Sequence, residues 1–195
     1  MVATYNISTA NSSAIVKNLT GATMVDWGDG SEIEDISSVT TYKHTYTSTG
    51  VFVAKFYGNI TELGYETFNS SRWLIDVVVP RSVVKIGERC AYGCVNLQSI
   101  KIGEFVSHFG ARPFVGATKL KLLEILALIP PTSDGWICQS GATGPKIIVP
   151  HISLEAYKTA SDWSDYASQI DAYAMASDID NINTELTNII EGEGV

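Results

Sequence analysis

The sequence predicts a mainly β protein with a small β-sandwich, a solenoid of short repeats, a helical cap and a C-terminal coiled-coil helix. Three observations predict this fold class. Residues 1–58 contain short runs of β-forming residues, the middle of the chain repeats with an offset of 23 residues, and the end carries apolar residues at heptad spacing. The four parts are expected at residues 1–58, 59–150, 151–170 and 171–195.

The composition limits the classes of partner. The 195 residues are 45% hydrophobic and 17% charged, with a formal net charge of −8, and that acidic balance argues against a nucleic-acid partner. No run of 18 apolar residues occurs, so we expect no membrane insertion. The start, MVATYNISTANSS, lacks the basic and apolar segments of a secretory signal. We expect retention in the cytoplasm, export by another route such as assembly into a particle, or a removed leader.

Residues 1–58 have an all-β pattern. The runs TYNI, IVKNL, TMVDWG, TYKHTY and VFVAKFYG are rich in Val, Ile, Thr and aromatic residues and are separated by Asn, Ser, Gly and Asp. MVDWGDGS, followed by HTYTSTGVFVAKFYG, resembles the PKD domain family, whose fold is an immunoglobulin-like β-sandwich. The matching residues are Trp27, Gly28, Asp29, Gly30, Ser31, His44, Tyr46, Gly50 and Val53. Asp26 precedes the tryptophan instead of following it, and Phe52 replaces a tyrosine. The resemblance implies a shortened sandwich.

Residues 60–126 contain three copies of a 23-residue unit. The copies share the columns Leu63/Ile86/Phe109, Gly64/Gly87/Gly110, Phe68/Ala91/Phe114, Ser71/Cys94/Ala117, Leu74/Leu97/Leu120, Val77/Ile100/Leu123 and Val79/Ile102/Ile125. Alternation at Val77 and Val79 predicts one short strand per unit, and the shared glycine predicts a tight backbone turn. A single unit cannot bury its apolar edge, so the units are expected to stack into about four turns of a solenoid.

The second unit, IGERCAYGCVNLQSIKI, resembles the BspA-like leucine-rich repeat of bacterial surface proteins. That consensus reads roughly I-G-x-x-A-F-x-x-C-x-x-L-x-x-I-x-I-P. The sequence matches it at Ile86, Gly87, Cys94, Leu97, Ile100 and Ile102. It departs at Cys90 and Ala91, where Ala and Phe are usual. The resemblance extends from residue 60 to about residue 166.

The cap and the tail follow the repeats. Pro150 ends the last predicted strand, and Ser153 is expected to cap a helix that covers the open end of the solenoid. From Ala172, apolar residues follow at spacings of 3, 4, 3, 4 and 3, which is a coiled-coil seam. We expect either docking on the same chain or a homo-oligomer, with a trimer favoured by the isoleucines. The seam residues are Met175, Ile179, Ile182, Leu186 and Ile189.

The candidate chemical sites have structural alternatives. Cys90 and Cys94 lack a second pair of metal ligands, so buried free thiols are expected. Asp26 and Asp29 are weak candidates for a calcium site, and a tight turn is the alternative. The three histidines are scattered, and no nucleophile or nucleotide motif is present. We therefore expect no enzyme, no resident metal and no cofactor.

Both resemblances imply a binding or structural protein, because these modules are non-catalytic in most relatives. We expect a structural or adhesive component of a virion, in a phage of gut bacteria, as a capsid decoration, fibre or tail appendage. Its partners would be other virion proteins or a host-surface glycan or protein. The alternatives are a bacterial cell-surface adhesin and an accessory carbohydrate-binding module of a secreted enzyme. Candidate binding residues are Trp73, Tyr92 and Trp136, with the loop 130–145.

Overall fold

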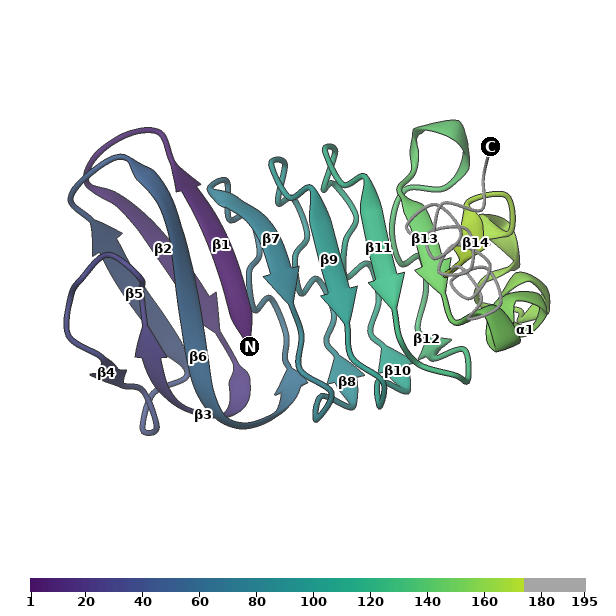
Figure 1. The fold of residues 1–195 in the computed structure, drawn as a ribbon, viewed down its shortest axis with the longest axis horizontal. Helices are drawn as coiled ribbons and strands as arrows, with labels where there is room; N and C mark the ends of the chain where they lie inside the picture. The colour runs from purple at the N-terminus through teal and green to yellow at the C-terminus, as the bar shows by residue number, and fades with distance from the viewer. Residues whose placement is uncertain (174–195) are drawn as a thin grey trace, which may run out of the picture.

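The computed structural model describes residues 1–173, which form an elongated and mainly β structure (Figure 1). Its strands are β1 (Val2–Ile7), β2 (Ser12–Lys17), β3 (Leu19–Asp26), β4 (Glu34–Asp35), β5 (Thr41–Tyr46), β6 (Gly50–Leu63), β7 (Leu74–Val78), β8 (Lys85–Ile86), β9 (Ser99–Ile102), β10 (His108–Phe109), β11 (Leu122–Ile125), β12 (Thr132–Ser133), β13 (Lys146–Val149) and β14 (Ile170–Ala172). One α-helix, α1 (Leu154–Thr159), and 3₁₀ helices at Gly141–Thr143, His151–Ser153 and Ser164–Tyr166 complete the described part. None of its helices is long and apolar enough to cross a membrane.

A single 12-stranded sheet runs through both the sandwich and the solenoid. Its order is β12-β10-β8-β6-β1-β7-β9-β11-β13-β14, with β3 on β6 and β4 on β3. Strand β1 is antiparallel to both β6 and β7. Two parallel ladders, β6-β8-β10-β12 and β7-β9-β11-β13-β14, therefore meet through β1 at the N-terminal end of the solenoid. Figure 1 shows the two rows of strands extending from this junction.

The strand registers confirm the repeat. Val77 pairs with Ile100 and Ile100 with Leu123, each at an offset of 23 residues. Leu123 then pairs with Ile147 at an offset of 24, and Ile147 with Ile170 at 23. These side chains form one buried column of the core. Ile170 was expected in the helical cap, but it lies in the last strand of the ladder.

Each turn of the solenoid contributes two strands where we predicted one. The second ladder contains Leu63, Ile86 and Phe109, which are all buried. Its strands β8 and β10 are two residues long. Such short strands leave no alternating pattern in the sequence, and for this reason the prediction missed them.

Two sheets face each other at the N-terminal end. Strands β2 and β5 form a separate two-stranded sheet, and Tyr46 of β5 lies 6.1 Å from Tyr5 of β1 between ring centroids. The predicted boundary between residues 58 and 59 falls inside β6. Strand β6 pairs with β1 and β3 and ends beside β8, where Leu63 pairs with Ile86. The sandwich and the first turn of the solenoid thus share one strand.

The glycine column reflects close contact between solenoid turns. A Cβ atom on Gly87 would overlap the carbonyl group of Gly64 in the previous turn, and one on Gly110 would overlap the backbone of Glu88. Neither glycine has a positive φ, so the expected tight turn is not the reason for glycine. Left-handed backbone occurs elsewhere in each unit. It includes the column Glu66, Arg89 and Arg112, with φ of 57°, 53° and 57°.

The cap is shorter than predicted but covers the end of the solenoid. Helix α1 ends at Thr159, and Ser153 makes no cap hydrogen bond because its hydroxyl donates to the Leu128 carbonyl at 2.6 Å. Tyr157 donates to the Ala127 carbonyl at 2.9 Å, and the Trp163 indole donates to the Pro131 carbonyl at 2.7 Å. These bonds anchor the cap to the loop after β11.

The predicted C-terminal helix does not begin at residue 171. Residues Ile170–Ala172 form β14, because their apolar column continues the parallel ladder. The remaining seam residues, Met175, Ile179, Ile182, Leu186 and Ile189, lie outside the described residues.

Candidate binding site

Tyr92 and Trp136, two of the three candidate binding residues, line the same groove. The groove has a volume of about 470 Å³, and its other lining residues are Ala111, Arg112, Val115, Asp134 and Gly135. The Trp136 side chain is unusually accessible, with Trp136 73% exposed and Tyr92 37% exposed. An exposed large aromatic residue in a hollow is a feature of binding surfaces. We call this hollow the aromatic groove.

Trp73 lies elsewhere. It is half-buried and packs against the core, and its carbonyl accepts a hydrogen bond from the Asn6 amide at 2.8 Å. This contact joins β1 to the first turn of the solenoid. Trp73 therefore contributes to the junction between the two parts of the chain and not to the aromatic groove.

Three successive turns of the solenoid build the aromatic groove. The Gly93 amide donates to the Val115 carbonyl at 2.9 Å, and the Arg112 amide donates to the Trp136 carbonyl at 2.8 Å. These bonds fix the backbone of each turn against the next. Tyr92, Arg112 and Trp136 consequently project from consecutive turns toward one hollow, and the spacing between them is set by the solenoid.

The groove offers polar groups with unused hydrogen-bonding capacity. Within the described residues, the Arg112 side chain makes no hydrogen bond or ion pair. One carboxylate oxygen of Asp134 lies 3.1 Å from His108 Nε2, which leaves the other oxygen available. Arg89 lies 5.8 Å from the centroid of the Tyr92 ring and supports it from outside the groove. The site thus combines aromatic faces with a donor and an acceptor.

A larger cavity of about 710 Å³ is lined mainly by apolar residues, including Phe105, Leu128 and Ile129. The polar groups at its rim already have partners. Glu104 pairs with Arg81 at 3.3 Å, and the Thr132 hydroxyl donates to the Ser107 carbonyl at 3.3 Å. The lining of this cavity contains no lysine or arginine, so it lacks the charged donor that the aromatic groove places beside a carboxylate.

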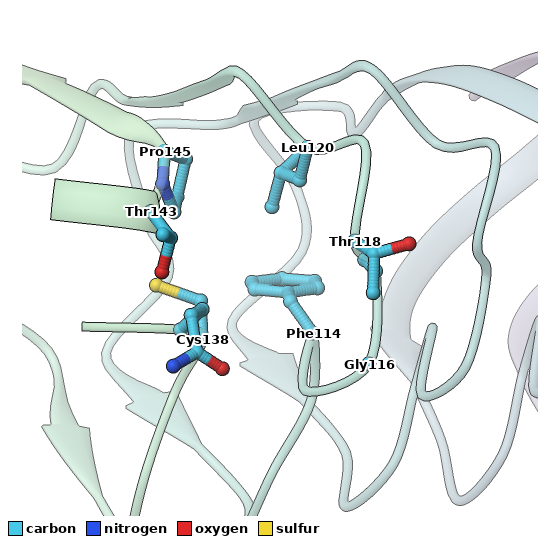
Figure 2. Close-up of a pocket in the computed structure, with 9 residues that line it drawn as sticks. Phe114, Gly116, Thr118, Leu120, Cys138, Thr143 and Pro145 are labelled. Atoms are coloured by element: carbon cyan, nitrogen blue, oxygen red, sulfur yellow. The ribbon is translucent and has the colours of Figure 1, made fainter. Parts of the chain in front are cut away.

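A third cavity lies between the last repeats and the loop 139–145. Its volume is about 190 Å³, and Phe114, Leu120, Cys138 and Thr143 contribute to its lining. Figure 2 shows the Cys138 thiol pointing toward Thr143, with the Phe114 ring below Leu120. Burial raises the pKa of Cys138 to about 12, so the thiol is protonated at neutral pH. The cavity is smaller than a typical ligand site.

Cys90 and Cys94 are buried free thiols, as predicted. The Cys94 thiol donates to the Phe68 carbonyl at 2.9 Å. Burial raises the pKa of Cys94 to about 12 and raises that of Cys90 further. Both thiols are therefore protonated and unreactive at neutral pH.

The residues matched to the PKD pattern form one cluster in the sandwich. The indole of Trp27 stacks on His44 with centroids 4.9 Å apart, and the Tyr46 hydroxyl donates to the Trp27 carbonyl at 3.1 Å. Asp29 accepts hydrogen bonds from the Ser31 hydroxyl at 2.6 Å and from His44 Nε2 at 2.7 Å. Although its partial burial alone would raise the value, these bonds lower the pKa of Asp29 to about 2.

The two calcium candidates take part in a turn. Asp26 accepts a hydrogen bond from the Gly28 amide at 2.9 Å, and Gly28 and Gly30 have φ of 77° and 86°. This geometry supports the tight-turn alternative. Among residues 1–173, no three or more His, Cys, Asp or Glu side chains are arranged to hold a metal ion.

Sequence signals for the groove were partial. Tyr92 and Trp136 were predicted as exposed aromatic side chains, with Trp136 in the loop 130–145. Arg112 and Asp134 carry no such signal, since exposed charged residues are common on any surface.

Comparison with protein families supports the repeat. Residues 35–131 match the family model described as BspA type Leucine rich repeat region (6 copies). The comparison with curated proteins gives no match. The matched segment contains β5 to β11 and four residues of the aromatic groove, Tyr92, Ala111, Arg112 and Val115. The middle of this chain is therefore a leucine-rich repeat region of the BspA type.

Proposed function

We propose that this protein is a non-catalytic binding protein that attaches to a partner through the aromatic groove. The observation that carries the proposal is the convergence of Tyr92, Arg112 and Trp136 from three successive turns on one hollow. Tryptophan, tyrosine and arginine are enriched among the residues that dominate binding energy, and the two aromatic residues bury large areas at low entropic cost. Most of the Trp136 side chain is available for such burial.

The proposed setting is the particle of a phage that infects gut bacteria, in which the chain would be a capsid decoration, fibre or tail appendage. The elongated form supports this proposal, because it places the sandwich at one end and the last repeats near the other (Figure 1). The sandwich, which we propose is PKD-like, would face other virion proteins. The groove would face a glycan or protein of the host surface.

We also propose a homotrimer formed through the C-terminal seam. The sequence supports it, because isoleucine at both seam positions favours three or four strands over two. Light scattering should give the mass of three chains, and removal of residues 174–195 should give the mass of one. A single-chain mass before and after removal would contradict the trimer.

The binding proposal is tested on intact gut bacteria. Trp136→Ala should weaken attachment to susceptible cells by about tenfold or more, because it removes the largest contact surface of the groove. Tyr57→Ala is the matched control, since Tyr57 is an exposed aromatic residue of the sandwich, 44% exposed. Equal attachment of Trp136→Ala and the unchanged chain would disprove the proposed function.

The setting is tested separately with antibodies against the chain. Labelling of purified virus particles from a gut sample would support the phage proposal. Labelling confined to bacterial envelopes in the same sample would favour the alternative, a cell-surface adhesin, which the BspA-type repeat also supports.

A further inference from the structure

We propose that the aromatic groove binds a neutral sugar residue of a glycan, which stacks on Trp136 and hydrogen-bonds to Arg112 and Asp134. This inference rests on the proposed function, because it names the ligand class of the same groove.

The aromatic side chains offer the surface that a sugar ring needs. One face of a pyranose ring carries C–H groups, whose slightly positive hydrogens are attracted to the negative face of an aromatic ring. Trp136 is 73% exposed, and Tyr92, which lines the same groove, is 37% exposed. A sugar stacked on Trp136 would cover apolar area that otherwise faces water.

The polar side chains match the other surface of a sugar. Sugar hydroxyls both donate and accept hydrogen bonds, so their recognition uses a donor beside an acceptor. The Arg112 guanidinium has only donors, and Asp134 keeps one carboxylate oxygen unengaged beside its 3.1 Å contact with His108. Together they can bind two neighbouring hydroxyls.

The charge favours a neutral ligand. Arg112 and Asp134 are the charged residues of the lining and offset each other. The whole chain carries a formal net charge of −8, which repels polyanionic glycans. The groove volume of about 470 Å³ lies within the usual range for small-ligand sites.

The backbone argues against a bound extended peptide. Peptides that add to a sheet need free backbone donors and acceptors at a strand edge. In the groove, the Arg112 amide and the Trp136 carbonyl bond to each other at 2.8 Å. Recognition must then come from the side chains, and these suit a sugar. Asp134 is the single carboxylate of the described lining, whereas glycoside hydrolysis typically uses two, so the groove suits binding.

The first experiment titrates the full chain with methyl glycosides of glucose, galactose, mannose and N-acetylglucosamine, followed by NMR and calorimetry. At least one should bind with a Kd of about 1 mM or below. Trp136→Ala should weaken that binding about tenfold or more, and Arg112→Gln and Asp134→Asn each by about threefold to tenfold. Trp136→Tyr should retain most of it, since stacking is preserved, and Tyr57→Ala should leave it unchanged. A thermal melt of each variant verifies folding.

The second experiment separates this inference from the proposed function. Susceptible cells are treated with periodate, which cleaves vicinal diols of glycans, or with protease. Loss of attachment after periodate treatment but not after protease treatment supports a sugar ligand. If none of the neutral glycosides binds, and protease alone removes Trp136-dependent attachment, the groove binds a protein and the sugar inference is wrong. Preferential binding of N-acetylneuraminic acid would also overturn it. Attachment that does not depend on Trp136 would disprove both proposals.

Discussion

At the scale of single residues, the hydrogen bonds of Asp29 stabilise the turn between β3 and β4, in residues 27–33. Its carboxylate accepts from both the amide and the hydroxyl of Ser31 and contacts His44. His44 in turn stacks on Trp27, which is fully buried. A surface carboxylate is thereby linked to the sandwich core through one imidazole ring.

This link gives the stability a defined pH dependence. The pKa of Asp29 is about 2, against an ordinary value of 3.8. Because the folded value is the lower one, the ionised carboxylate stabilises the fold above about pH 4, and this stabilisation is lost as the pH falls toward 2. Asp29→Asn should lower the free energy of unfolding at pH 7 by up to about 2 kcal/mol. Urea denaturation between pH 2.5 and pH 7 should show a flatter profile for the variant below pH 4.

The control for this prediction is Asp35→Asn. Asp35 accepts hydrogen bonds from Ser37 in a similar turn, at 2.6 Å from the hydroxyl, but it is exposed and unconnected to His44. Its replacement should change the acid profile less. Parallel profiles for the unchanged chain and Asp29→Asn would show that Asp29 contributes no acid-dependent stability.

At the scale of the repeat unit, the stack depends on how closely neighbouring turns approach. Gly64 lies against Asn18 of the sandwich, and Gly87 and Gly110 each lie against the backbone of the preceding turn. Backbone atoms of adjacent turns are in contact there, so even a methyl group finds no space. The column is thus a packing requirement of the solenoid and is independent of φ.

Gly87→Ala should therefore destabilise the protein by about 2–4 kcal/mol, because its Cβ would overlap backbone that cannot move without separating two turns. Gly30→Ala is the matched control. Gly30 has a φ of 86° but no atom within 4 Å of its added Cβ, so its cost should be only the left-handed strain of about 1 kcal/mol. Chemical denaturation measures both. A smaller loss for Gly87→Ala than for Gly30→Ala would show that the turns can separate freely.

The apolar columns in the sequence predicted the repeat units. The features that depend on backbone conformation and on contacts between turns were not predicted. The long ladder was predicted from the apolar column Val77, Ile100 and Leu123, because these side chains must be buried together. Arg89 and Arg112 adopt positive φ values, which an arginine in the sequence does not predict. Trp136 and Tyr92 line the same groove only because the turns stack. No sequence pattern within one unit predicts this. The apolar columns of the repeat specify the core, whereas the groove depends on which residues the stacking of successive turns brings together.

At the scale of the whole molecule, β1 makes the sandwich and the solenoid one structure. Its residues pair with β6 on one edge and with β7 on the other, so Val2 faces both Lys55 and Val78. The sandwich therefore closes the first end of the solenoid, and the cap with Trp163 closes the second. A solenoid with both ends covered is expected to unfold as one cooperative unit.

Tyr5 of β1 tests this cooperativity, because it is fully buried at the junction and lies 6.1 Å from Tyr46. Tyr5→Ala should lower the stability by about 3–5 kcal/mol. Tyr5→Phe should be neutral or stabilising, since the buried Tyr5 hydroxyl has no hydrogen-bond partner among residues 1–173. Hydrogen exchange should then show equal losses of protection in β5 and in the distant β11 for Tyr5→Ala. Protection that falls in β5 and persists in β11 would mean that the solenoid stands without the sandwich, and that the shared strand β6 does not couple them.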